Sequence, residues 1–122
     1  MAALATTLVL GGARSGKSTF AENLVRDSGR VCVFVATATA GDEEMRERIA
    51  RHRAERDKNW RTIEEPLAIA DIVAHESAAD RAILIDCLTL WLSNLMHAGR
   101  NVEAETLNLL AAGLPLWLKR AP

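Results

Sequence analysis

The chain has 122 residues, which is enough for one domain with one hydrophobic core. Apolar residues make up 49% and charged residues 25% of it, a composition typical of a globular protein and not of a disordered chain. The formal net charge is −1, so no global basic field supports a nucleic-acid partner.

The sequence also lacks the marks of a membrane or secreted protein. No apolar stretch is long enough to span a membrane, and the opening residues MAALATTLVL lack the basic start of a secretory signal. We therefore expect a cytoplasmic protein. Cys32 and Cys87 lack the spacing of a metal site, and each lies in an apolar run. We interpret them as buried thiols in a reducing compartment, with a disulfide between them as the alternative.

The first part of the chain predicts a strand, a glycine-rich loop, a helix and a second strand. Residues 5–10, ATTLVL, predict a short buried strand that ends at two glycines. Apolar residues at helical spacing predict a helix over 17–27, which a Ser-Gly-Arg turn stops. The continuous apolar run VCVFVATA, residues 31–38, is typical of a strand that is covered on both faces.

The rest of the chain predicts further helices and one more strand. Residues 42–57 predict a highly charged helix with an acidic first turn and a thin apolar stripe. The segment NWRTIEEP, residues 59–66, is expected to be irregular or extended. The remaining segments are a helix over 67–77, a buried strand over 81–86, helices over 88–99 and 102–112, and a short apolar tail interrupted by Pro115.

This order of elements predicts an α/β fold. Strands separated by helices pair in parallel through right-handed crossovers, which gives a sheet flanked by helices. The glycine loop would lie at the carboxyl end of the first strand, where open α/β sheets bind ligands. We expect residues 1–122 to form a single domain.

The stretch GGARSGKS satisfies the P-loop pattern G-x-x-x-x-G-K-[ST] between a predicted strand and a predicted helix. Glycines let the backbone curl so that successive N–H groups point at phosphate oxygens, and the helix N-terminus adds partial positive charge. Lys17 would reach the β- and γ-phosphates, and the Ser18 hydroxyl would ligate Mg²⁺. The pattern predicts a nucleotide-phosphate site in a P-loop NTPase-like, mostly parallel sheet; a glycine turn without a ligand is the alternative. The residues of the loop are Gly11, Gly12, Ala13, Arg14, Ser15, Gly16, Lys17 and Ser18.

Asp86 is the second residue that we expect to serve the metal. It ends the apolar run AILID, so its carboxylate would emerge at the sheet edge that carries the loop. We interpret it as a ligand of Mg²⁺ or of the nucleotide. The alternative is an N-cap for the following helix, and the two roles are compatible.

His52 lies in the charged segment RERIARHRAER. On a helix, Arg48 and Arg56 are its neighbours at i−4 and i+4, so three nitrogen-bearing side chains would share one face. Neighbouring cations disfavour the imidazolium and favour the neutral, nucleophilic ring. From the charge pattern alone, a solvated basic face that contains a histidine is the simpler interpretation.

Three stretches together resemble a known family. GGARSGKS, the block VATATAGDEEMRERIARHRAERDKNWRTIEEP and the stretch ILIDCLTLWLSNLM look like the bifunctional adenosylcobinamide kinase / adenosylcobinamide-phosphate guanylyltransferase family of cobalamin assembly. The resemblance runs from residue 7 to about residue 106, and the block around the histidine is far more specific than the P-loop. It implies an enzyme that phosphorylates the aminopropanol hydroxyl of adenosylcobinamide. The enzyme then transfers GMP from GTP through a covalent guanylyl-histidine.

The resemblance also implies which residues act. The nucleophilic histidine falls on His52, and Lys17 stabilises the transferring group. GTP is the implied cofactor, with ATP as an alternative phosphate donor, together with Mg²⁺ at Ser18 and Asp86. The implied acceptor is a corrinoid, adenosylcobinamide. Nucleotide contacts map onto the loop from Gly11 to Ser18 and onto Thr37, Ala38, Thr39, Arg53, Ala54, Glu55, Arg56, Glu64 and Asp86.

The chain departs from the family after about residue 106. Family members carry a further strand and an arginine-rich helix before a final strand similar to AGLPL, whereas here AAGLPLWLK follows the helix over 102–111 almost directly. We interpret the domain as internally shortened between about 106 and 112, so that it lacks a strand-helix segment. The sheet would then keep an unpaired edge, which favours a homo-oligomer. The alternative functions are a catalytically impaired nucleotide-binding remnant and a generic P-loop small-molecule kinase.

Overall fold

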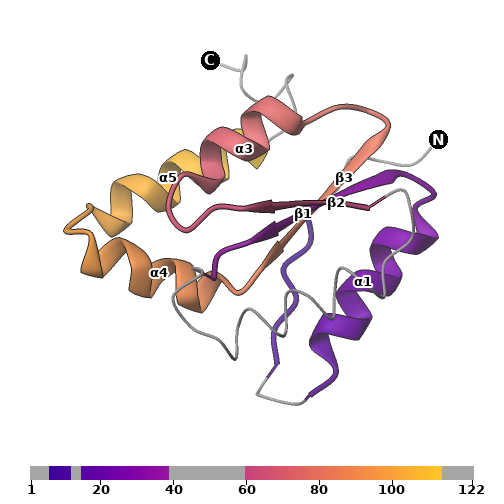
Figure 1. The fold of residues 1–122 in the computed structure, drawn as a ribbon, viewed down its shortest axis with the longest axis horizontal. Helices are drawn as coiled ribbons and strands as arrows, with labels where there is room; N and C mark the ends of the chain where they lie inside the picture. The colour runs from indigo at the N-terminus through magenta and orange to yellow at the C-terminus, as the bar shows by residue number, and fades with distance from the viewer. Residues whose placement is uncertain (1–5, 12–14, 39–59, 114–122) are drawn as a thin grey trace.

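The computed structural model describes residues 6–11, 15–38 and 60–113. Four predicted helices, over 17–27, 67–77, 88–99 and 102–112, are confirmed within a few residues. The helix expected over 42–57 and the apolar tail lie outside the described residues. None of the described helices combines the length and apolarity needed to cross a membrane. The elements, labelled as in Figure 1, are α1 (Lys17–Asp27), β1 (Val31–Ala36), β2 (Trp60–Glu64), α3 (Ile69–Glu76), β3 (Arg81–Asp86), α4 (Leu88–His97) and α5 (Val102–Gly113).

The described strands form one parallel sheet in the order β2-β1-β3. Cys32 to Ala36 of β1 pair with β2, and the whole of β1 pairs with β3. Parallel neighbours need a crossover, and α3 supplies the crossover from β2 to β3. The sheet and its flanking helices confirm the predicted α/β architecture.

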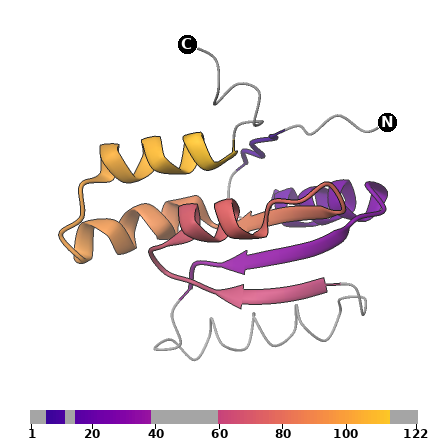
Figure 2. The same cartoon turned by 90° about the horizontal axis from the view of Figure 1, so that it is seen from above.

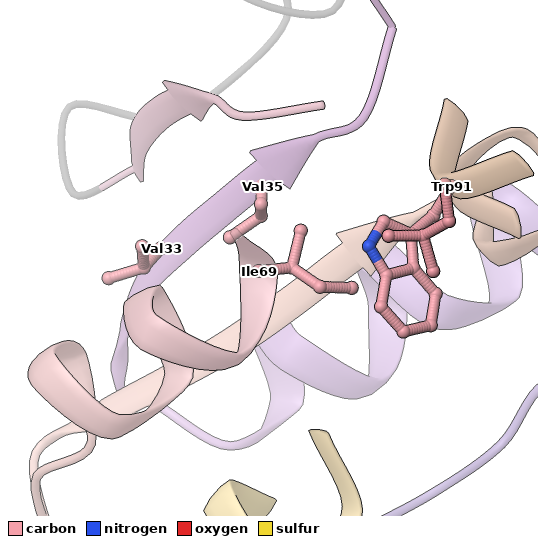
Figure 3. Close-up of a cluster of buried hydrophobic side chains, with 5 residues drawn as sticks. Val33, Val35, Ile69 and Trp91 are labelled. Carbon is pink, nitrogen blue, oxygen red and sulfur yellow. The ribbon is translucent and has the colours of Figure 1, made fainter. Parts of the chain in front are cut away.

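The central strand β1 is covered on both faces, as its continuous apolar run predicts. Val33 and Val35 point to one face, where they form a buried cluster with Ile69 of α3 and with Trp91 and Leu95 of α4 (Figure 3). Side chains alternate along a strand, so the residues between them must face the other way. The helices α3, α4 and α5 therefore lie on the Val33 side of the sheet (Figure 2).

Helix α1 covers the opposite face of the sheet (Figure 1). Cys32, Phe34 and Ala36 form the second buried cluster there, and Val25 of α1 packs against it together with Trp60 and Leu84. The helix begins at Lys17, after its N-cap Gly16, and Gly29 ends the turn that follows it with a positive φ of 69°. The Ser-Gly-Arg stop is therefore confirmed.

The strand predicted at residues 5–10 is wrong for the part that the structure describes. Residues 6–10 belong to no strand, and Leu8 and Leu10 are 65% and 81% exposed. A short apolar run becomes a strand only where its backbone amides and carbonyls pair with a neighbouring strand. Among the described residues, β3 pairs with β1 alone, so residues 6–10 do not extend the sheet. Because β3 has a single neighbour, it lies at an edge of the described sheet. Its residues are half-buried, whereas the sequence predicted a buried strand.

The cysteine prediction is half right. Cys32 is buried in β1, but Cys87 is exposed. Neither cysteine forms a disulfide, so the alternative of a disulfide between them is also wrong. The apolar run that contains Cys87 ends at the turn into α4, where Cys87 adopts a left-handed φ of 70°. That turn brings the residue out of the sheet.

Candidate functional site

The junction between the glycine loop and α1 carries the main local feature of the site. Gly16 is the N-cap of α1 and adopts a left-handed conformation with φ 84°. It has no side chain to cap the helix, and no acidic residue occupies the first turn. The first amides of α1 therefore lack a side-chain cap at this position, and an N-terminus of this kind attracts anions.

The described residues on either side of positions 12–14 lie close together. A Cβ added at Gly11 would lie 2.5 Å from the hydroxyl oxygen of Ser15. The ammonium group of Lys17 donates a hydrogen bond of 2.9 Å to the carbonyl oxygen of Gly11. The two ends of the predicted P-loop are therefore close together, and the lysine lies across them.

The loop lies toward the carboxyl ends of the strands. Residues 28–30 alone separate α1 from β1, so the helix runs back against the strand (Figure 1). An 11-residue helix is roughly 16 Å long, and a six-residue strand is roughly 20 Å long. The N-terminus of α1 at Lys17 therefore lies near the level at which the strands end, and α1 also contacts β3.

The two predicted acidic residues occupy one row at that end of the sheet. Ala36 pairs with Glu64 of β2 on one side and with Asp86 of β3 on the other. Parallel strands lie about 4.8 Å apart, which places the two acidic Cα atoms roughly 10 Å from each other. Residues in register point to the same face, and Ala36 belongs to the cluster on the α1 face. Both carboxylates therefore share the face on which the glycine loop lies.

Asp86 does not cap the following helix. The N-cap of α4 is Cys87, whose sulfur accepts a hydrogen bond of 3.4 Å from the amide of Leu90. The alternative interpretation of Asp86 as an N-cap is therefore wrong. Within the described residues, the Asp86 carboxylate makes no hydrogen bond or ion pair, so no local contact accounts for it.

A set of side-chain hydrogen bonds joins the segments that follow the strands. The Thr37 hydroxyl, which is buried, donates to the carbonyl oxygens of Asp86 and Cys87, each at 2.9 Å. The side-chain amide of Asn94 donates to the carbonyl oxygens of Thr37 and Pro66, at 2.9 and 3.1 Å. These bonds connect the ends of all three strands.

The carboxylates at this edge suit a Mg²⁺ ion that phosphates and water help to hold, and not a metal ion that protein side chains alone surround. Across the described residues, no three His, Cys, Asp or Glu side chains come together as a cluster that could hold a metal. Mg²⁺ is commonly held by one or two carboxylates together with substrate phosphates and water. One carboxylate at Asp86, on the sheet face that α1 covers, matches the protein's part of that pattern.

The structure describes about half of the predicted site residues. It brings Thr37, Ala38, Glu64 and Asp86 to one edge of the sheet, with Gly11, Ser15, Gly16, Lys17 and the backbone of Ser18 on the α1 side. Gly12, Ala13, Arg14, Thr39, His52, Arg53, Ala54, Glu55 and Arg56 lie outside the described residues. Sequence reasoning missed Asn94, although a polar residue within the apolar run LTLWLSNLM is an available signal.

A second charged cluster lies at the opposite end of the sheet. The buried carboxylate of Glu76, at the end of α3, forms ion pairs with Arg61 of β2 and with Arg81 of β3, the latter at 2.6 Å. The hydrogen bond from Arg61 lowers the pKa of Glu76; burial opposes this, and the charges of Arg61, Arg81 and His75 add to the lowering. This cluster joins α3 to the starts of two strands.

Comparison with known proteins supports the resemblance. The sequence profile described as cobinamide kinase / cobinamide phosphate guanyltransferase matches residues 7–116. The chain is 58% identical over 89 residues to the bifunctional adenosylcobalamin biosynthesis protein CobP of Pseudomonas aeruginosa, which covers 73% of this chain and 51% of that protein. The proteins named CobU are 39% identical in Escherichia coli and 42% identical in Salmonella typhimurium, over 89 and 91 residues. Those matches cover 73% and 75% of this chain, and 49% and 50% of the two relatives.

The alignments cover most of this chain but only about half of each relative. The chain spans about half the length of the curated relatives that it matches. The profile match nevertheless covers most of the 122 residues, from before the glycine loop to beyond α5. The chain belongs to the cobinamide kinase / cobinamide phosphate guanyltransferase family.

Proposed function

We propose that this chain binds GTP with Mg²⁺ in the cytoplasm and uses it in two transfers that belong to cobalamin assembly. The first phosphorylates adenosylcobinamide, with ATP as an alternative donor. The second transfers GMP from GTP to adenosylcobinamide phosphate. The observation that carries the proposal is the shared placement of the loop junction at Gly16 and Lys17 and of the carboxylates of Glu64 and Asp86 on one face at one end of the sheet.

The phosphate groups would lie against the loop. The amides at the start of α1 donate to phosphate oxygens, and Lys17 exchanges its bond to the Gly11 carbonyl for one to the β- and γ-phosphates. Ser18 and Asp86 would hold Mg²⁺, which supplies neutralisation of the charge that develops on the transferring phosphoryl group. Glu64, in the same row as Asp86, would accept hydrogen bonds from the sugar or base of the nucleotide.

The guanylyl transfer would proceed through His52. A ring nitrogen of the neutral imidazole attacks the α-phosphorus of GTP, a nitrogen–phosphorus bond forms, and the bond to the β-phosphate oxygen breaks, releasing pyrophosphate. A phosphate oxygen of adenosylcobinamide phosphate then attacks the same phosphorus. The nitrogen–phosphorus bond breaks, adenosylcobinamide-GDP leaves, and the histidine is restored. Arg53 and Arg56 would stabilise the charge on the group in transfer.

The experiment is covalent labelling with GTP that is radioactive at the α-phosphate. We expect an adduct that is labile to acid and stable to alkali, present in the wild-type protein and absent in His52→Ala. His97→Ala is the matched control, because His97 is an exposed histidine on α4. Within the described residues, its ring makes a hydrogen bond to the carbonyl oxygen of Ser93, in its own helix. An adduct that survives in His52→Ala, or that disappears in His97→Ala, would contradict the assignment.

A second function is binding without transfer. The exposed Leu8 and Leu10, and the edge position of β3 in the described sheet, favour a domain whose sheet is completed by further copies of the chain or left incomplete. Such a remnant binds Mg-GTP but forms no adduct. A generic P-loop kinase, in contrast, transfers the γ-phosphate whether or not His52 is present. Labelling with α-radioactive GTP separates the two-transfer enzyme from both alternatives, and transfer of radioactivity from γ-labelled GTP to a small-molecule acceptor separates the kinase from the remnant.

A further inference from the structure

We propose that Asn94 is a positioning residue for the nucleotide site and acts through the backbone of Thr37. This role rests on the proposed function, because it assumes that the carboxyl edge of the sheet receives the nucleotide. Asn94 lies on α4 and is separated by 57 residues from Thr37 and by 28 from Pro66. Its contacts therefore join parts of the chain that only the fold brings together.

Both hydrogen bonds of the Asn94 side-chain nitrogen go to segments that follow strands. One reaches the carbonyl oxygen of Thr37 after β1, at 2.9 Å. The other reaches the carbonyl oxygen of Pro66 after β2, at 3.1 Å. A side-chain amide has two N–H donors, so this group is fully used by the two carbonyls. Asn94 therefore fixes the spacing between these two segments.

Thr37 connects Asn94 to the end of β3 through its own hydrogen bonds. Its carbonyl accepts from Asn94, while its hydroxyl shares its one proton between the carbonyl oxygens of Asp86 and Cys87. Thr37 is only 1% exposed, so water does not replace these bonds readily. The chain of contacts from Asn94 through Thr37 to Asp86 ties the backbone of the proposed metal ligand to α4.

The same helix supplies a control that separates positioning from stability. Trp91, one turn before Asn94, donates from its indole nitrogen to the carbonyl oxygen of Leu67 at 2.9 Å. This bond holds the segment after β2 but does not reach Thr37 or the end of β3. Loss of the Trp91 bond therefore lowers stability without releasing Thr37, whereas loss of the Asn94 bonds releases it.

The test compares Asn94→Leu, which keeps the approximate shape but removes both donors, with Trp91→Phe. The unfolding midpoint and the Kd for GTP with Mg²⁺ are measured for each full-length variant at a temperature where it is folded. We expect a Kd at least tenfold higher in Asn94→Leu, and a Kd within twofold of wild type in Trp91→Phe despite its lower unfolding midpoint. Hydrogen exchange at the amides of Ala38 and Cys87 should speed up only in Asn94→Leu.

Thr37→Val repeats the test from the other side of the contact chain if Asn94→Leu does not fold, and it too should raise the Kd. Wild-type protein that fails to bind GTP with Mg²⁺ would overturn the proposed function and this role with it. Wild-type binding together with an unchanged Kd in the Asn94 or Thr37 variant would overturn the positioning role alone.

Discussion

Replacement of Gly16 by alanine tests the loop junction directly. Gly16 has φ 84°, a left-handed conformation that costs an ordinary residue about 1–2 kcal/mol. Alanine also restricts the unfolded chain, which offsets roughly 0.4–1 kcal/mol of that cost. No atom lies within 4 Å of a Cβ at this position, so steric overlap adds nothing. Gly16→Ala should therefore lower the free energy of unfolding by about 1 kcal/mol, or about 4 °C in Tm.

Two other glycines provide matched controls. Gly29 and Gly99 have φ values of 69° and 68°, and a Cβ at either would also meet open space. They follow the C-termini of α1 and α4, away from the glycine loop. Gly29→Ala and Gly99→Ala should therefore cost about the same stability, about 1 kcal/mol each. Denaturant unfolding measures the three losses.

Affinity for GTP with Mg²⁺ should distinguish Gly16 from the two controls. The free Gly16→Ala protein can relax out of the left-handed conformation, and binding has to restore it. A cost of about 1 kcal/mol corresponds to a Kd roughly fivefold higher. Titration calorimetry should show this change in Gly16→Ala and none in Gly29→Ala or Gly99→Ala. Equal affinities in all three variants, at equal losses of stability, would refute the assignment of the loop as the phosphate site.

Three further predictions concern single side chains. Because the pKa of Glu76 is lowered in the folded protein, its ion pairs contribute their full stability above the ordinary pKa of 4.5, and this stability is lost as the pH falls through the pKa of the folded state. An acid titration of the unfolding midpoint should show this loss in wild type and a shallower loss in Glu76→Gln. Asp86→Asn should abolish the Mg²⁺ dependence of GTP binding with little effect on Tm, because the carboxylate makes no bond to the described residues; a large fall in Tm would assign it a structural role. Native protein should expose one reactive thiol, Cys87, and denatured protein two, as thiol titration measures; rapid reaction of Cys32 in the native protein would contradict its burial.

Much of the described fold could be predicted from local pattern. The run at residues 31–36 is apolar at every position, which identifies a strand with both faces covered, and the structure places it in the centre of the sheet. The helices after Gly16 and Cys87 follow from helical spacing and from the glycines that end them. The position of Asp86 at the carboxyl edge follows from parallel pairing, because parallel strands end at the same side.

The predictions that failed have a common physical cause. Contacts between residues far apart in the sequence cannot be predicted from the spacing of residues within one segment. Leu8 and Leu10 have the composition of a strand but no described ladder, so they are exposed. Cys87 follows an apolar run, yet a left-handed turn brings it to the surface. Asn94 looks like an ordinary polar residue on a helix until the fold places two distant carbonyls beside it. Such partners can be assigned only when the strands are in register.

The most direct measurement is the structure of the full chain crystallised with Mg²⁺ and a GTP analogue that cannot be hydrolysed. We predict phosphate oxygens within about 3 Å of the amides at Gly16 and Lys17 and of the Lys17 ammonium group, with the metal beside Asp86. A triphosphate bound at another surface, with the Lys17 ammonium group still on the Gly11 carbonyl, would contradict the central claim.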